Sequence, residues 1–213
     1  MKNFIFIHIP KTGGTAICHA LGIDEVGHFK IDYLKSIYTE RWDKAFKFAV
    51  VRNPWDRFVS NYEYSRMLVN YWHNNIDPSK AVYGSHSDYE IVKDMTFEEY
   101  VDAVYHGKHN LIATGLHHQH QYICQSDKIE IDYVCRFERL QSDFDVVCKL
   151  IGRDKVILPK VNVSEREKAH YRDYYNKKTK NMIGEFYRRD VELFHYSFDN
   201  KNLFKNVLKF FFK

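Results

Sequence analysis

The chain has 213 residues, with 45% hydrophobic and 28% charged side chains and a formal net charge of only +4. These values predict one soluble globular domain, and the weak, mixed charge argues against a nucleic-acid partner. The four cysteines form no C-x-x-C pair, so we expect free thiols and a cytoplasmic protein. We expect no secretory signal, because only Met-Lys-Asn precedes the first apolar run, which leads directly into a glycine loop. We expect no transmembrane helix, because no apolar run approaches the ~20 residues that span a bilayer.

The first quarter of the chain alternates between strand and helix patterns. The continuous apolar run 3–9 predicts a strand buried on both faces, and a helical pattern over 14–22 follows it and ends in glycine. A second buried strand is predicted over 46–52. The next helix starts at Asn53-Pro54, where asparagine suits the cap and proline the first helical position.

Residues 69–95 are polar and aromatic and predict a long surface excursion. The elements predicted after it are a helix over 96–107 with Thr96 and Glu99 as a capping box, a strand over 128–138, a helix over 139–152, a short strand over 155–159, and two helices within 164–196 broken near Lys177. Repeated strand–loop–helix units indicate an α/β fold with three layers. In this P-loop-like arrangement, helices flank a central, mostly parallel sheet.

The stretch from Lys11 to Thr15 follows the first predicted strand and reads Lys-Thr-Gly-Gly-Thr. A strand, a glycine loop and a helix N-terminus form an anion site, because backbone N–H groups and the helix dipole favour negative charge there. Gly13 and Gly14 let the backbone close around an anion, Thr12 and Thr15 add hydroxyl donors, and Lys11 adds a positive charge. The lysine precedes the glycines, whereas it follows them in the P-loop of nucleotide hydrolases, which disfavours an Mg²⁺-dependent triphosphatase.

A second anion site is predicted at the end of the second strand. Arg52 ends the run 46–52, and a guanidinium at a strand end suits bidentate phosphate binding. Ser60 lies two helical turns further on and adds a hydroxyl. Two anion sites on separate strand–helix junctions indicate a ligand with two separate phosphate groups.

The sequences KTGGT (11–15) and VRNPWDR (51–57), followed by Ser60, resemble the motifs of the sulfotransferases that use 3′-phosphoadenosine 5′-phosphosulfate (PAPS). The branch with carbohydrate and heparan-sulfate sulfotransferases is the most similar. The stretch RFERLQSDF (136–144) is similar to a strand–helix unit of that family, and the likeness spans residues 4 to 198. The resemblance implies that the first loop holds the 5′-phosphosulfate of PAPS, and that Arg52 and Ser60 hold its 3′-phosphate.

The resemblance also implies roles for single residues. Lys11 would stabilise the charge of the leaving phosphate, and His28, between the two motifs, would deprotonate the acceptor hydroxyl. The alternative for His28 is a polar residue that opens the following helix. Arg166 would close over the cofactor from a late loop, or would be a solvated charge. His8, inside the first strand, is expected to be buried and hydrogen-bonded.

Two further segments carry distinctive patterns. Three histidines lie within 117–120, but sulfuryl transfer needs no metal, so no metal site is predicted; Gln119 matches a family position and is expected in the wall of the acceptor site. The tail 200–213 carries a lysine at every fourth position from Lys201. This spacing predicts a basic amphipathic helix that docks on the domain or, alternatively, touches the inner surface of a membrane.

We therefore expect a sulfotransferase domain over 1–199 that moves a sulfuryl group from PAPS, without a metal, to a hydroxyl of a glycan or glycolipid. Aromatic residues of the 69–95 excursion would shape the acceptor site. Two alternatives remain open, a PAPS-fold binding module without turnover and a nucleotide-dependent kinase.

Overall fold

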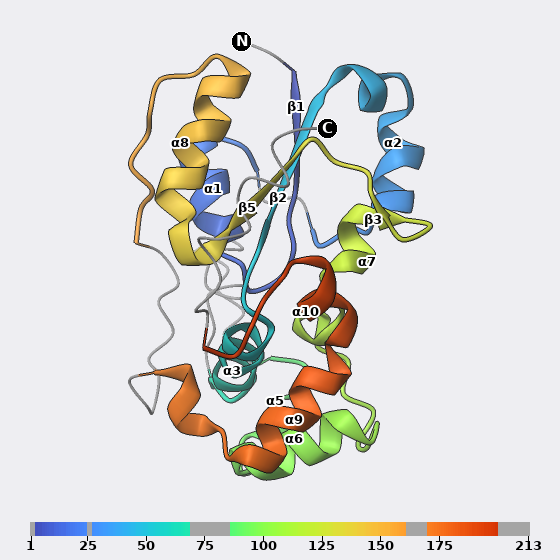
Figure 1. The fold of residues 1–213 in the computed structure, drawn as a ribbon, viewed down its shortest axis with the longest axis vertical. Helices are drawn as coiled ribbons and strands as arrows, with labels where there is room; N and C mark the ends of the chain where they lie inside the picture. Colours follow the sequence, from blue (N-terminus) through green and yellow to red (C-terminus); the bar gives the residue numbers. More distant parts are fainter. Residues whose placement is uncertain (1–2, 25–26, 69–85, 161–169, 200–213) are drawn as a thin grey trace. The chain divides into compact units, whose positions relative to one another are not determined.

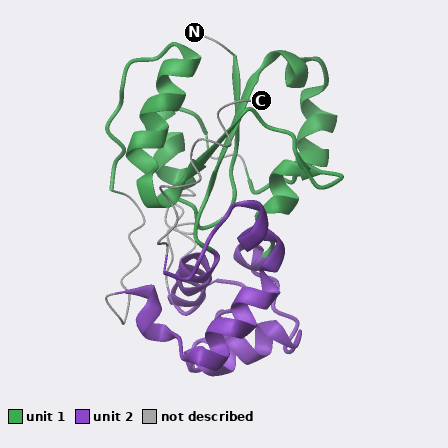
Figure 2. Ribbon diagram, in the orientation of Figure 1, with its two compact units in different colours: residues 1–53, 117–161 green, residues 54–116, 162–213 purple. Residues whose placement is uncertain are grey.

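The computed structural model describes residues 3–24, 27–68, 86–160 and 170–199. The chain divides into two compact units, one formed by residues 1–53 and 117–161 and the other by residues 54–116 and 162–213 (Figure 2). The first unit carries the parallel sheet, and the described part of the second is helical (Figure 1). Arg166, the tail 200–213 and residues 69–85 of the predicted excursion lie outside the described residues.

The sheet of the first unit has the order β1-β2-β5, with both pairings parallel. Its strands are β1 (Phe4–Ile7), β2 (Phe46–Val51) and β5 (Tyr133–Arg136). The middle strand is buried on both faces, because Phe48 to Val51 are fully enclosed. This burial explains why the run is continuously apolar rather than alternating.

Helices cover both faces of this sheet, which confirms the predicted three-layer α/β arrangement. In Figure 1, α1 (Gly14–Leu21) and α8 (Leu140–Ile151) lie on one side of the strands, while α2 (Ile31–Lys44) and the short α7 (His120–Ile123) lie on the other. The core on the α1 and α8 side joins side chains from the three strands and both helices, among them Phe6, Ile17, Phe48, Cys135, Phe144 and Val147.

The predicted helix ends are confirmed where local chemistry sets them. Gly22 ends α1 with φ 62°, and Gly152 ends α8 with φ 73°, both in the left-handed region that favours glycine. α3 (Pro54–Ser65) begins at its proline. Thr96 forms the predicted capping box in front of α6 (Phe97–Tyr105).

The predicted strand over 128–138 is wrong as one continuous element. Its start, β4 (Lys128–Ile129), pairs antiparallel with β3 (Cys124–Gln125) in a separate hairpin, and its end is the 3₁₀ turn η2 (Phe137–Arg139). Between them Asp132 turns the chain onto β2, since its carboxylate accepts the Lys47 N–H at 2.7 Å. Only β5 joins the main sheet.

The predicted short strand over 155–159 is also wrong. The amide of Gln141, on α8, takes the hydrogen bonds that a neighbouring strand would have made. Its Nε2 donates to the carbonyl of Val156 at 3.0 Å, and its Oε1 accepts from the N–H of Leu158 at 2.8 Å. The segment therefore runs along a helix without sheet pairing.

The end of the predicted excursion is ordered rather than a surface loop. Residues 86–95 contain α5 (Tyr89–Val92), and Val92 is fully buried. Asp88, also buried, accepts the N–H groups of Ile112 at 3.1 Å and Ala113 at 2.9 Å. A buried carboxylate that binds two backbone donors joins segments that the sequence pattern left unrelated.

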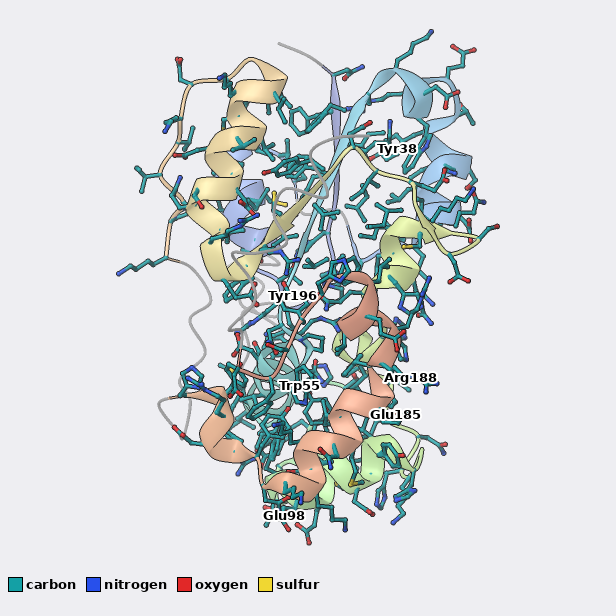
Figure 3. The ribbon with its side chains drawn as sticks, viewed as in Figure 1. Tyr38, Trp55, Glu98, Glu185, Arg188 and Tyr196 are labelled. Atoms are coloured by element: carbon teal, nitrogen blue, oxygen red, sulfur yellow. The ribbon has the colours of Figure 1, made fainter. Side chains whose placement is uncertain are left out.

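The second unit is a helical cluster around an aromatic core. Besides α3, α5 and α6 it contains η1 (Thr114–Leu116), η3 (Tyr171–Tyr174), α9 (Lys177–Phe186) and α10 (Arg188–Leu193). The predicted break near Lys177 is confirmed, since α9 begins there, but the described residues of the helix predicted before it form only the 3₁₀ turn η3. A second break separates α9 from α10, where Glu185 and Arg188 form an ion pair at 3.4 Å (Figure 3). Trp55, labelled in Figure 3, donates its Nε1–H to the Lys180 carbonyl at 2.9 Å.

Two further findings concern the whole described chain. None of its described helices is long and apolar enough to cross a bilayer. The four cysteines are free thiols, as predicted, and burial raises the pKa of Cys135 and of Cys148. A raised pKa keeps these thiols protonated, which is typical of inert core cysteines.

Tyr100→Phe tests the polar contact within the aromatic core of the second unit. The buried Tyr100 hydroxyl accepts from Asn61 Nδ2 at 2.8 Å, and burial raises the pKa of the phenol. Removing it leaves the enclosed Asn61 amide short of an acceptor, so the free energy of unfolding should fall by about 1–3 kcal/mol in denaturant titration. Tyr105→Phe, on the same helix but 37% exposed, is the matched control and should change it by less than about 0.5 kcal/mol. Equal effects of the two substitutions would contradict this account.

Candidate active site

The loop between β1 and α1 has the geometry of an anion site. Lys11 has φ 64° and Gly13 has φ 83°, so the backbone bends twice through the left-handed region before α1 begins at Gly14. The first N–H groups of a helix have no acceptor inside the helix. The first turn of α1 contains no acidic residue, so nothing on that turn offsets the positive end of the helix dipole.

The loop is seated tightly on the end of β1. The Thr12 hydroxyl is fully buried and donates to the carbonyl of Ile9 at 2.8 Å. A Cβ added to Gly14 would lie 2.0 Å from the ring of His8, so only glycine fits between this ring and the loop. The Thr12 hydroxyl proton is thus used within the loop, and a ligand contact by Thr12 stays a prediction; Thr15 is half-buried on the first turn of α1.

Arg52 links the second predicted anion site to the first. It follows β2 and is 6% exposed. Its Nη1 donates to the carbonyl oxygen of Lys11 at 3.0 Å, and its guanidinium carbon lies 4.0 Å from the centre of the Phe137 ring. The structure therefore brings together Lys11 and Arg52, which are the key residues of the two motifs.

Phe137, in the turn after β5, contacts both motifs, and the sequence analysis gave it no role. A Cβ added to Gly13 would lie 3.2 Å from its ring, so the ring packs directly against the loop. The same ring carries the Arg52 guanidinium, in a cation–π contact. One aromatic side chain thus braces both motifs, and the only sequence signal for it is its place within RFE at 136–138.

Two buried polar side chains hold the main chain at the end of β2. Gln119 is fully buried, and its amide group makes hydrogen bonds to both the N–H and the carbonyl of Arg52. Glu138 accepts the N–H of Asn53 at 2.6 Å. The prediction that Gln119 lines the acceptor site is not supported by this geometry, because its amide is directed at the Arg52 backbone.

His28 lies next to the loop, in the irregular segment before α2. Its Nδ1 is 3.0 Å from the carbonyl oxygen of His8, and a carbonyl oxygen can only accept, so Nδ1 carries the proton. In the neutral ring the lone pair is then on Nε2, the nitrogen that can take a proton from a substrate. The ring centres of His28 and His8 are 4.4 Å apart.

His8 is buried as predicted, and it is held neutral. Burial, together with the nearby His28, lowers the pKa of His8 to about 3. Its ring contacts Phe6 on one side, at 5.7 Å between centres, and Gly14 in the loop. The contacts from His28 to His8 to Gly14 place the candidate base and the anion loop in one packed cluster.

Ser60 and Arg166 remain predictions. Ser60 lies on α3 in the second unit and is 3% exposed. The motif VRNPWDR is divided at the boundary between the units, with Val51, Arg52 and Asn53 in the first and its remaining residues in the second. Arg166 lies outside the described residues. Of the three histidines within 117–120, His117 contacts Tyr122, with 3.2 Å between its Nδ1 and the tyrosine hydroxyl oxygen.

The residues of the first unit fit a bisphosphate ligand in two respects. The loop bends at Lys11 and Gly13 just before α1, and the first turn of α1 carries no acidic side chain, so its N–H groups and helix dipole favour an anion. The guanidinium carbon of Arg52 lies 4.0 Å from the centre of the Phe137 ring, and its Nη1 donates to the Lys11 carbonyl, so the cation is held beside the first loop. Lys11, Gly13 to Thr15 and Arg52 are the residues that would hold such a ligand.

The fold and this site define a three-layer α/β protein with a glycine loop for an anion at its first strand–helix junction. A family model described as the sulfotransferase family matches residues 1–197, almost the whole chain. The chain therefore belongs to the sulfotransferase family, whose members are PAPS-dependent enzymes that transfer sulfuryl groups. Neither a curated protein nor a solved structure matches it significantly.

Substitution of Lys11 tests whether its backbone is strained. A left-handed conformation costs a residue with a Cβ roughly 1–2 kcal/mol, and glycine avoids that cost. We expect Lys11→Gly to be more stable than Lys11→Ala by about 1 kcal/mol in denaturant unfolding. At Ala20, inside α1, alanine should be more stable than glycine, and Ala20→Gly should lower the free energy of unfolding by about 0.5–1 kcal/mol. If Lys11→Ala were the more stable of the pair, the backbone at Lys11 would be unstrained.

Proposed function

We propose that this protein transfers a sulfuryl group from PAPS to a hydroxyl of a glycan or glycolipid. The observation that carries the proposal is the contact between the two anion motifs, in which the Arg52 guanidinium donates to the Lys11 carbonyl. A donor with phosphates at both its 5′ and 3′ positions needs two cationic sites on one frame. Membership of the sulfotransferase family supports the reaction type.

In this proposal the loop and Lys11 act on the leaving group. When bound, the donor supplies an activated sulfuryl group attached to its 5′-phosphate. The amides at the start of α1 and the Lys11 ammonium face the oxygen that gains charge as the sulfur–oxygen bond breaks. Their interaction is strongest in the transition state, which is what accelerates the transfer.

His28 is proposed as the base for the acceptor hydroxyl. The hydrogen bond from Nδ1 to the His8 carbonyl fixes the tautomer, so the Nε2 lone pair is the proton acceptor. The acceptor oxygen forms its bond to sulfur as its proton moves to Nε2. The neutral, buried His8 beside it adds no positive charge that would interfere with this proton transfer.

Arg52 is proposed to bind the 3′-phosphate, with Ser60 and Arg166 as further ligands suggested by the family resemblance. The Phe137 ring, 4.0 Å from the guanidinium carbon, and the Lys11 carbonyl hold the cation beside the first loop, and a guanidinium there suits bidentate binding of a phosphate. Ser60 belongs to the other unit, so its contribution rests on the sequence motif alone.

Exposed aromatic rings near His28 support a sugar-containing acceptor. Phe29 and Tyr33 are 37% and 50% exposed, and their ring centres are 4.6 Å apart. They follow His28 directly in the chain and on the first turn of α2. Sugars stack on such faces, because an aromatic ring offers an apolar surface with a polar rim. We also keep the proposal that aromatic residues of 69–95 form part of the acceptor site.

Calorimetric titration with 3′-phosphoadenosine 5′-phosphate, the product that remains when PAPS loses its sulfuryl group, tests the donor. We expect micromolar binding by the wild type, no comparable binding of ATP with Mg²⁺, and at least ~10-fold weaker binding by Arg52→Ala, because a charged hydrogen-bond pair is lost. Preferential binding of ATP with Mg²⁺ would favour the kinase alternative. Absence of bisphosphate binding would refute the proposed donor.

His28→Asn tests the base, with radiolabelled PAPS and a panel of glycans and glycolipids. Turnover should fall by about 10²–10⁴-fold, as expected for the loss of a general base, while bisphosphate affinity stays unchanged. His19→Asn, on exposed helical surface, is the control and should keep full turnover. Unchanged turnover in His28→Asn would exclude His28 as the base, and no turnover by the wild type with any acceptor would favour a binding module.

A further inference from the structure

We propose that Gln119 is a positioning residue for Arg52: its buried amide fixes the end of β2 so that the guanidinium is held ready for the anionic ligand. This inference rests on the proposed function, because it takes Arg52 as the residue that binds the donor. It gives Gln119 a role different from the wall of the acceptor site suggested by the family resemblance.

The hydrogen bonds between Gln119 and Arg52 form a closed pair. Gln119 Oε1 accepts the Arg52 N–H at 2.8 Å, and Gln119 Nε2 donates to the Arg52 carbonyl at 2.9 Å. A primary amide that binds both groups of one residue replaces a neighbouring strand at this point. The pairing of β2 with β5 ends at Val51, one residue earlier, so the main chain of Arg52 would otherwise lose its sheet partner.

The position of this pair in the structure explains why the placement of Arg52 depends on it. Gln119 directly precedes α7 and is fully buried, so its amide is enclosed together with the Arg52 groups that it binds. The next residue, Asn53, is held through its N–H by Glu138 at 2.6 Å. Two consecutive peptide groups at the end of β2 are thus bound by side chains 67 and 85 residues away in the sequence.

The Arg52 side chain starts from this fixed backbone. Its side chain contacts the Lys11 carbonyl at 3.0 Å and the face of the Phe137 ring at 4.0 Å, and neither of these two contacts sets where its Cα lies. A shift of the backbone would move the guanidinium off the ring and away from the loop. Sites of this kind lose affinity when a ligand-binding group is misplaced by about 1 Å.

Bisphosphate titration of four proteins tests the inference: wild type, Gln119→Met, Arg52→Ala and the double variant. Methionine has nearly the same volume as glutamine but can make neither hydrogen bond. Gln119→Met should weaken 3′-phosphoadenosine 5′-phosphate binding by about 10-fold in the wild-type background. In the Arg52→Ala background the same substitution should have no further effect, because a residue that acts through Arg52 has nothing left to position.

A conservative variant adds a readout that a purely structural role would not move. In Gln119→Glu the carboxylate still accepts the Arg52 N–H but faces the Arg52 carbonyl without a donor. Protonation of that carboxyl at low pH restores the donor. The affinity of Gln119→Glu relative to the wild type should therefore recover as the pH falls. This variant also decides the question if Gln119→Met does not fold.

Gln121→Met is the matched control, because Gln121 lies on α7 two residues away and is exposed. It should bind the bisphosphate as the wild type does. Two outcomes would overturn the inference and leave the proposed function intact. In the first, Gln119→Met weakens bisphosphate binding as much in the Arg52→Ala background as in the wild type. In the second, the affinity of Gln119→Glu relative to the wild type does not change with pH. Failure of the wild type to bind the bisphosphate would refute the proposed function itself.

Discussion

The fixed end of β2 is the constraint on which the rest of the site depends. At Arg52 the sheet pairing stops, and side chains take over the hydrogen bonds of the main chain, Gln119 at Arg52 and Glu138 at Asn53. From that anchored backbone the Arg52 side chain crosses to the first loop and donates to the Lys11 carbonyl. Buried backbone groups require hydrogen-bond partners, and the side chains that supply them here also fix the position from which the Arg52 guanidinium extends.

The loop, the arginine and the candidate base share one packed cluster in the first unit. Phe137 contacts Gly13 and carries the Arg52 guanidinium, while His8 packs under Gly14 and receives the hydrogen bond of His28. The two glycines are therefore required for different reasons. Gly13 needs its left-handed backbone, and Gly14 needs to have no Cβ. Close packing transmits any change at one of these residues to the others.

Much of the fold followed from local patterns, and the errors share a cause. Buried parallel strands, helix caps at Thr96 and Gly22 and the start of α3 at Pro54 are set by neighbouring residues, so they could be predicted. The segment near Val156 could not, because the side chain of Gln141 takes its backbone hydrogen bond, and the segment around Asp88 could not, because its carboxylate binds the distant N–H groups of Ile112 and Ala113. Periodicity reports which faces are apolar, but it does not show which backbone a buried amide or carboxylate will bind.

The sequence by itself determined the residue types of the site: a lysine and two glycines after the first strand, an arginine after the second, and a histidine between them. Those motifs also led to the family that the match over residues 1–197 establishes. Only the tertiary structure decided that Gln119 holds Arg52, that Phe137 joins the two motifs, and that the His28 proton is on Nδ1. These contacts join residues up to 124 positions apart (Gly13 and Phe137), and folding brings them together through the parallel sheet.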